Sequence, residues 1–191
     1  MPSAKLTADV ATLGSKFKVL STSDFRGETT LVLEREAIHE ACRIARDEMG
    51  FNFLLDVSGV DNFGVDPRFE VVYELYSMAR GEWLRFKVQV SEDDLTVPTI
   101  SDLWATADWH EREAFDMYGI RFTGHADLRR ILMWEGYPFY PLRKDFPLGG
   151  RASDAPDVAF SRAAPLEGGP FVTVPTTATT KDREPRSRST E

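Results

Sequence analysis

Cysteine is almost absent from this sequence of 191 residues, which contains one, Cys42. A single cysteine forms no internal disulfide and cannot supply the four thiolates of a common iron–sulfur cluster. Cys42 lies in a helical pattern, where we expect a small buried thiol. No apolar run approaches the roughly 20 residues of a membrane-spanning helix, and the first residues lack the features of a signal peptide. We therefore expect a soluble, cytoplasmic protein that reaches a membrane only through partners.

Basic residues are also scarce, because 23 Lys and Arg stand against 31 Asp and Glu, for a net charge of −8. Nucleic-acid binding usually requires a basic face, so we expect no nucleic-acid partner. The phosphate-loop patterns G-x-G-x-x-G and G-x-x-x-x-G-K-[ST] do not occur, nor does the G-x-S-x-G nucleophile elbow. These absences argue against a nucleotide site built on a phosphate loop and against a nucleophile relay.

Hydrophobic residues make up 42% of the chain, which is enough to bury a core. Apolar residues recur at helical spacing from Leu6 to Phe17 and again over about 35–49, where Gly50 suits a left-handed cap. The expected strands are 28–35, 51–61, 68–78 and 83–90, with a turn at 79–82 between the last two. The pattern predicts an α+β fold, a mostly antiparallel sheet with packed helices.

The character of the sequence changes after this α+β domain, which we assign to residues 1–97. Thr99, with Asp102 three residues later, indicates a capping box, so a helix is predicted over 98–119 with Gly119 as its cap. Residues 120–171 are rich in Pro, Gly and aromatic residues, which favours an extended arm. That arm either folds back on its own domain or lies on another protein. The polar residues 172–191 read as a disordered tail.

Residues 108–119, DWHEREAFDMYG, concentrate titratable side chains and raise the question of catalysis. The zinc motif H-E-x-x-H is incomplete because position 114 is alanine. Glu111 and Glu113 point about 200° apart on a helix, so they cannot converge on one metal ion or one substrate bond. No catalytic, cofactor-binding or metal-binding residue is therefore expected. The cluster is interpreted as architectural, a polar helix end that positions the arm.

Glu111 falls within the apolar stripe of the predicted helix, together with Ile100, Trp104 and Phe115. A buried carboxylate without a partner costs several kcal/mol or takes up a proton, so a partner is expected. The candidate partners are Arg129, Arg130 and Arg143, whose guanidinium groups bind carboxylates through paired hydrogen bonds. Arg112 lies on a flank of the stripe. Glu113 and Asp116 lie away from it, either on a solvated face or in an ion-pair or partner contact.

Two spaced segments, EREAFDMYGIRFTGHADLRRIL and PLRKDFPLGG, carry a family resemblance. They resemble the C-type, 30 kDa subunit of NADH:quinone oxidoreductase, which is respiratory complex I, over about residues 28–150. The usual Gly-His-Pro-Leu-Arg-Lys-Asp is replaced by GYPFYPLRKD, a longer aromatic insert. The positions assigned to the family signature and interface are Glu111, Arg112, Glu113, Asp116, Gly119, His125, Arg129, Arg130, Pro141, Arg143, Lys144 and Asp145.

The resemblance implies a structural, connecting role in the peripheral arm of the complex. A subunit of this type has no redox centre and packs on the quinone-site (D-type) subunit, near the iron–sulfur (B-type) subunit and other peripheral-arm subunits. FMN and iron–sulfur clusters belong to the partner subunits, which pass electrons from NADH to quinone while the complex pumps protons. The expected location is the cytoplasmic side of the cell inner membrane, as a peripheral membrane protein.

Three alternatives stay open at this point. An equivalent subunit occurs in membrane-bound hydrogenases related to complex I. A stand-alone metal-dependent hydrolase would use His110, Glu111, Glu113 and His125. A free-standing binding module would be consistent with the acidic charge and the arm.

Overall fold

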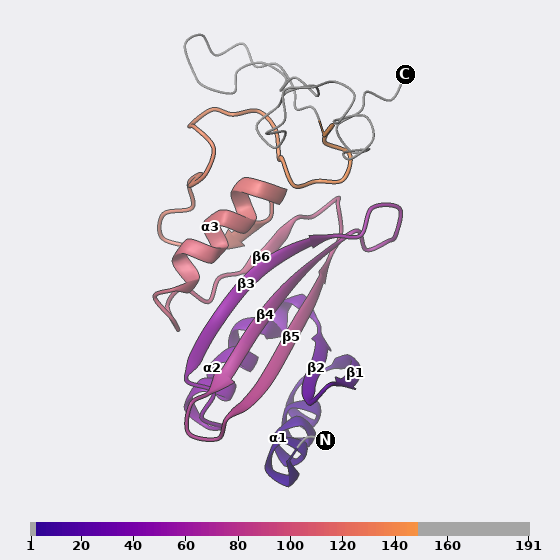
Figure 1. The fold of residues 1–191 in the computed structure, drawn as a ribbon, viewed down its shortest axis with the longest axis vertical. Helices are drawn as coiled ribbons and strands as arrows, with labels where there is room; N and C mark the ends of the chain where they lie inside the picture. Colours follow the sequence, from indigo (N-terminus) through magenta and orange to yellow (C-terminus); the bar gives the residue numbers. More distant parts are fainter. Residues whose placement is uncertain (1–2, 149–191) are drawn as a thin grey trace, which may run out of the picture. The chain divides into compact units, whose positions relative to one another are not determined.

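A five-stranded sheet forms the centre of the structure, a computed structural model that describes residues 3–148. Its strands are β1 (Val19–Phe25), β2 (Glu28–Leu33), β3 (Phe53–Asp61), β4 (Phe69–Ser77) and β5 (Glu82–Val90). They lie in the order β1-β2-β5-β4-β3, with β2 parallel to β5 and the other neighbours antiparallel (Figure 1). The predicted α+β class with a mostly antiparallel sheet is confirmed.

Four helical segments accompany this sheet, and the three α-helices bury apolar side chains in the core. The segments are α1 (Ala4–Lys16), η1 (Arg35–Ala37), α2 (Ile38–Asp47) and α3 (Ala107–Tyr118). The Ser3 hydroxyl caps α1 by accepting a hydrogen bond from the Leu6 amide at 3.1 Å. Behind the sheet in Figure 1, α2 buries Ala41, Cys42 and Ala45. The predicted helix over 35–49 is thus found, with a 3₁₀ first turn, and the expected buried thiol is confirmed.

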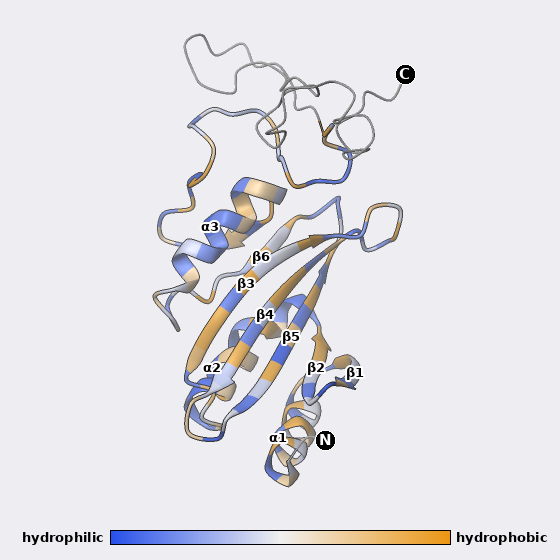
Figure 2. Ribbon diagram, in the orientation of Figure 1, coloured by the Kyte–Doolittle hydropathy of each residue, from blue (hydrophilic) through white to orange (hydrophobic). Residues whose placement is uncertain are grey.

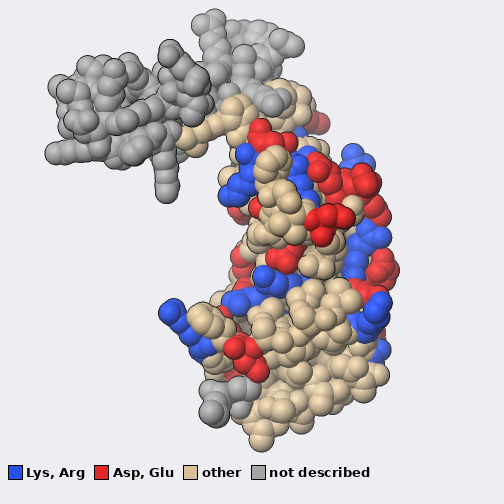
Figure 3. Space-filling model, turned by 90° about the vertical axis from the view of Figure 1, so that its right-hand side faces the viewer, with Lys and Arg blue, Asp and Glu red and all other residues tan. Residues whose placement is uncertain are grey.

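Side chains of β4 alternate between buried and partly exposed along the whole strand. Figure 2 shows the corresponding alternation of hydropathy along β3, β4 and β5. The buried side of the sheet holds large side chains such as Tyr73, Phe69 and Phe86, which pack with Phe51. Figure 3 shows positive and negative side chains interleaved on one face, beside a broad area that carries neither. One side of the sheet therefore faces the core and the other is only partly covered.

The strand β1 is absent from the sequence prediction. Nearly all of its residues are exposed, so the segment VLSTSDF shows none of the apolar alternation that reveals a half-buried strand. Two further short strands, β6 (Thr96–Pro98) and β7 (Arg121–Thr123), pair in parallel. Because they precede and follow α3 in the chain, their pairing fixes both ends of the segment that contains this helix.

The predicted start of the third helix is wrong. Residues 99–106 form turns that are not continuous with the helix, and α3 begins at Ala107. The proposed capping box does not form, because the Asp102 carboxylate instead contacts His39 Nε2 at 2.9 Å. The end of the helix is as predicted: Gly119 adopts φ 83° and donates its amide to the Phe115 carbonyl at 2.9 Å.

The chain divides into two units after residue 135. Residues 136–148 are the described part of the second unit, and the rest of the predicted arm, together with the tail 172–191, lies outside the described residues. The division of the chain into domains after residues 97, 119 and 171 stays a prediction. Within residues 3–148, no helix combines the length and apolar character needed to cross a membrane.

Candidate functional site

The carboxylate of Glu111 is fully buried on α3, as its place in the apolar stripe predicted. Its Oε1 accepts a hydrogen bond from the Ile100 amide at 2.7 Å, and its Oε2 accepts one from the Thr99 hydroxyl. Arginine is not the partner, so that prediction is wrong. The hydrogen-bond donors predicted from an arginine come instead from the segment 99–106, which supplies a backbone amide and a hydroxyl. Sequence spacing does not reveal such donors.

The environment of Glu111 raises its pKa to about 7. Burial is the main cause, because it penalises the charged form, and the nearby carboxylates of Asp102 and Asp108 act in the same direction. The hydrogen bonds from Ile100 and Thr99 oppose this shift without cancelling it. Glu111 therefore changes charge near neutral pH.

His125 lies beside this carboxylate with its side chain fully buried. Its Nε2 is 3.9 Å from Glu111 Oε2 and 3.3 Å from Asp108 Oδ1, while its Nδ1 accepts the Asp127 amide at 3.1 Å. An accepting Nδ1 places the ring proton on Nε2, which can donate to Asp108. His125 thus ties the chain after β7 to the first turn of α3.

The four residues of the hydrolase alternative do not converge. His110 Nδ1 contacts Asp56 of β3 at 3.2 Å, and Glu113 is exposed, whereas Glu111 and His125 are buried. Over the described residues, no group of three or more His, Cys, Asp or Glu is placed to hold a metal ion. The arrangement argues against metal-dependent hydrolysis by these side chains.

Asp116 is the second buried acid of α3, and it binds the segment that follows β7. Its Oδ2 accepts the amides of Ile131, Leu132 and Met133 at 3.1, 2.7 and 2.8 Å, and its Oδ1 lies 2.6 Å from Arg130 Nη1. For Asp116, the ion-pair alternative is therefore correct and the solvated-face alternative is not. A carboxylate that accepts three successive amides fixes the backbone locally.

Arg112 holds the same segment from another position on α3. Its guanidinium donates to the Arg129 and Arg130 carbonyls at 3.3 and 3.4 Å and stacks over the Trp109 ring at 5.0 Å. The side chain of Arg129 is itself exposed and pairs with Asp127. The backbone of residues 129–133 is thus held through its carbonyl groups by Arg112 and through its amide groups by Asp116.

Two large apolar side chains remain exposed next to these contacts. Trp109 on α3 is 59% exposed and Leu132 in the held segment is 62% exposed. Exposed aromatic and aliphatic side chains on a fixed backbone are typical of protein interfaces. We call Trp109 and Leu132 the α3 apolar pair.

Residues 136–148 make their own local contacts. The rings of Tyr137 and Phe139 lie 5.6 Å apart, those of Phe139 and Phe146 6.1 Å apart, and the Arg143 guanidinium stacks on Tyr140 at 4.6 Å. Pro141 is partly exposed, and Lys144 and Asp145 are exposed. The aromatic insert and the PLRKD motif therefore contact each other within this unit.

Known proteins are similar to this chain in sequence and in fold. The family described as "Respiratory-chain NADH dehydrogenase, 30 Kd subunit" matches residues 31–152, more than half of the chain. The chain belongs to this family. Its relatives include the NADH-quinone oxidoreductase C subunit of Geotalea uraniireducens, 45% identical over 74% of this chain and 87% of that protein. One of the C subunits of Rhizobium meliloti is 46% identical over 76% of this chain and 79% of that protein.

Solved structures share this fold. A trypsin-resistant fragment of Nqo5 superposes with a TM-score of 0.59 at 36% identity, covering 65% of this chain and 99% of the fragment. A chain from an archaeal membrane-bound sulfane sulfur reductase shares the fold, with a TM-score of 0.64 at 24% identity over 75% of this chain and 86% of its own. Glu111, Arg112 and Asp116, three positions of the predicted family signature, make contacts within the chain.

Proposed function

We propose that this chain is a connecting subunit of the peripheral arm of a proton-pumping NADH:quinone oxidoreductase. The complex passes electrons from NADH through FMN and iron–sulfur centres, held by partner subunits, to quinone. This chain holds no redox centre and docks on the quinone-site (D-type) subunit, near the iron–sulfur (B-type) subunit. Its attachment to the cytoplasmic side of the inner membrane is indirect, through the complex.

One observation carries this proposal: two charged residues of the predicted signature, Arg112 and Asp116, hold a backbone segment in place. Arg112 binds two carbonyls of residues 129–133 and Asp116 binds three amides. A catalytic residue needs access to a substrate, and Asp116 is completely buried. The hydrogen bonds leave the α3 apolar pair, Trp109 and Leu132, facing outward on a rigid support, which suits docking.

Affinity purification of the tagged chain from gently solubilised membranes tests the assignment. We expect recovery together with flavin- and iron–sulfur-bearing NADH dehydrogenase subunits. Recovery with a nickel–iron hydrogenase would move the chain to a related complex, and recovery of the chain alone would contradict a role as a subunit.

A double substitution tests the docking surface. Trp109→Ala with Leu132→Ala removes exposed area while leaving Asp116 and its hydrogen bonds in place, so the chain should fold and fail to co-purify with the other subunits. The matched control is Phe25→Ala, which truncates an equally exposed aromatic side chain at the β1–β2 turn. Normal co-purification of the double variant would exclude the α3 apolar pair as a docking surface.

A further inference from the structure

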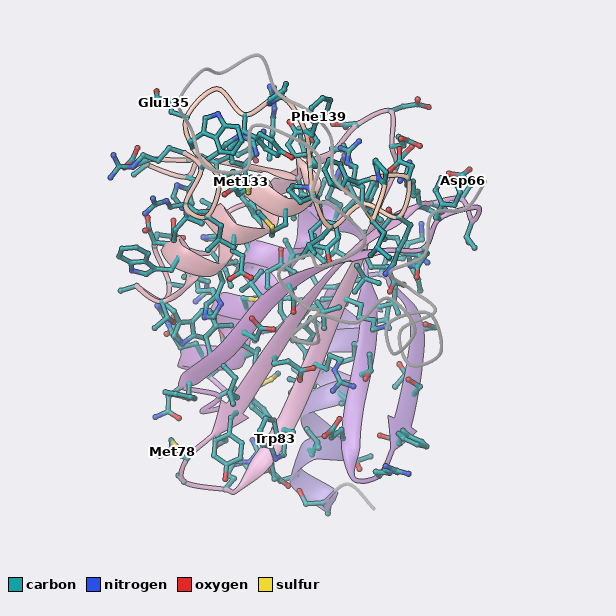
Figure 4. The ribbon with its side chains drawn as sticks, turned by 45° about the horizontal axis from the view of Figure 1, so that its top comes forward. Asp66, Met78, Trp83, Met133, Glu135 and Phe139 are labelled. Carbon is teal, nitrogen blue, oxygen red and sulfur yellow. The ribbon has the colours of Figure 1, made fainter. Side chains whose placement is uncertain are left out.

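A groove lies between two loops at the end of the sheet where β3 and β5 finish. It has a volume of about 460 Å³ and is lined by residues 63–66, Arg68 and residues 91–93. Figure 4 shows Asp66 on a loop that projects from the sheet, at the end opposite Met78 and Trp83. Neither Trp109 nor Leu132 lines this groove, so it is a surface separate from the α3 apolar pair.

Arg68 fixes the two walls of the groove to each other. Its Nε and Nη2 lie 2.8 and 2.9 Å from the two carboxylate oxygens of Asp61, and its Nη1 lies 2.8 Å from Glu92 Oε1. The guanidinium carbon lies 4.9 and 4.8 Å from the ring centres of Phe63 and Phe69. A side chain held by two carboxylates and two rings is preorganised. The two loops that form the groove are therefore held in a fixed arrangement by Arg68.

Negative charge in the groove exceeds positive charge. Three lining residues are acids, namely Asp66, Glu92 and Asp93, and the charge of Arg68 is shared between Glu92 and Asp61. Within residues 3–148, Asp66 and Asp93 form no ion pair with Lys, Arg or His. The acids of this region are not grouped to hold a metal ion. Their charge instead suits a cationic side chain, which needs no fixed coordination geometry.

Two exposed apolar side chains, Phe63 and Val65, also line the groove. Phe63 is 60% and Val65 61% exposed, and both sit on a loop whose shape is fixed by hydrogen bonds from the Asn62 amide to the Arg68 carbonyl at 2.8 Å and from the Val65 amide to the Asn62 carbonyl at 2.9 Å. Large exposed apolar side chains on an ordered loop gain free energy when a partner covers them. The groove thus combines exposed apolar side chains with exposed acidic ones.

We propose that this groove binds a segment of a neighbouring subunit that inserts a Lys or Arg side chain between Asp66 and Asp93 and lays an apolar residue on Phe63 and Val65. The proposal rests on the proposed function, because it takes its partner from the assembled complex. It gives the chain a second attachment point, independent of α3. Two such points on one rigid body fix orientation as well as contact.

The single cysteine allows a direct test. Cys42 is fully buried and burial raises the pKa of its thiol, so it does not compete for a maleimide probe. The variant Val65→Cys places one reactive thiol in the lining of the groove, and Phe25→Cys provides a reference of similar exposure at the β1–β2 turn. In the isolated full chain, the two variants should react with the maleimide at similar rates. In the purified complex, the Val65→Cys thiol should react at least about ten-fold more slowly.

A charge reversal identifies the chemistry of the partner. Asp66→Lys with Asp93→Lys, added to Val65→Cys, should restore the labelling rate in the complex to that of the isolated chain. The neutral pair Asp66→Asn with Asp93→Asn should restore it in part. Persistent protection after charge reversal would refute a cationic partner.

Two other outcomes would overturn the groove proposal. The first is equal labelling of the Val65→Cys thiol in the isolated chain and in the complex. The second is protection that already exists in the isolated chain and disappears on deletion of residues 149–191, which would make this chain's own tail the occupant. In both cases the chain still co-purifies with its partners, whereas failure of the proposed function would show as recovery of the chain alone.

Discussion

The substitution Glu111→Gln should make the stability of this protein less dependent on pH. The carboxylate is completely buried, and its two hydrogen-bond donors are the Ile100 amide and the Thr99 hydroxyl. The effect of burial on the pKa of Glu111 outweighs that of both hydrogen bonds, so this pKa rises from its ordinary value of 4.5 to about 7. Glutamine has nearly the same shape and keeps an oxygen for the Ile100 amide, but it never carries a charge.

The sign and size of this pH dependence follow from the pKa of Glu111 in the unfolded and in the folded state. Below the unfolded value of 4.5, the carboxyl is protonated in both states, and the stability associated with its raised pKa is fully present. As pH rises from there through the folded value of about 7, the unfolded chain releases its proton first, so this stability is lost. A difference of about 2.5 pKa units corresponds to roughly 3 kcal/mol at about 1.36 kcal/mol per unit.

Urea unfolding between pH 4.5 and pH 8, followed by tryptophan fluorescence at constant ionic strength, measures this effect. The free energy of unfolding of Glu111→Gln minus that of the unsubstituted protein should increase by about 3 kcal/mol across this range. The control is Glu113→Gln, an exposed position on the same helix, where the difference should stay within about 0.5 kcal/mol at every pH. A pH-independent difference for Glu111→Gln would refute the argument that burial dominates at this carboxylate.

Three further substitutions test other parts of the architecture. Asp116→Asn should lower the free energy of unfolding by about 3 kcal/mol in chemical denaturation, because it removes the carboxylate that pairs with the largely buried guanidinium of Arg130. An unchanged denaturation midpoint would contradict the anchoring role of Asp116. Gly59→Ala would place a Cβ 2.6 Å from Tyr118 Cδ2, so it should cost about 1–3 kcal/mol in thermal unfolding. Its control, Gly14→Ala in α1, meets no atom within 4 Å and should be neutral or stabilising. Arg143→Ala should reduce the amount of assembled complex more than turnover per complex, and the reverse result would indicate a direct role in electron transfer.

Periodic patterns in the sequence predicted the elements that have one buried side. The helix from Leu6, the helix that contains Cys42 and the three long strands were all found, because regular burial leaves a regular apolar spacing. The exposed strand β1 leaves no such trace. The start of α3 was misplaced because Thr99 uses its hydroxyl for Glu111 rather than for a helix cap.

The contacts of the candidate site were harder to predict than its residues. The apolar stripe predicted burial of Glu111, but its partners include a backbone amide, which every residue other than proline possesses. Asp116, which lies away from the stripe, also accepts backbone amides, and its three donors come from a segment 15–17 positions further along the chain. Sequence identifies which side chains are unusual, whereas the path of the backbone determines what they bind.

The parallel pairing of β2 with β5 has a consequence for the order of folding. Thr29 pairs with Leu84, across a stretch that contains α2, β3 and β4, whereas β3, β4 and β5 pair with neighbours in sequence. Closing the longer loop costs more chain entropy, so the β3–β5 meander should form before the β1–β2 hairpin joins it. During synthesis, the amino-terminal hairpin is therefore expected to wait without its sheet partner until residues 84–88 have left the ribosome.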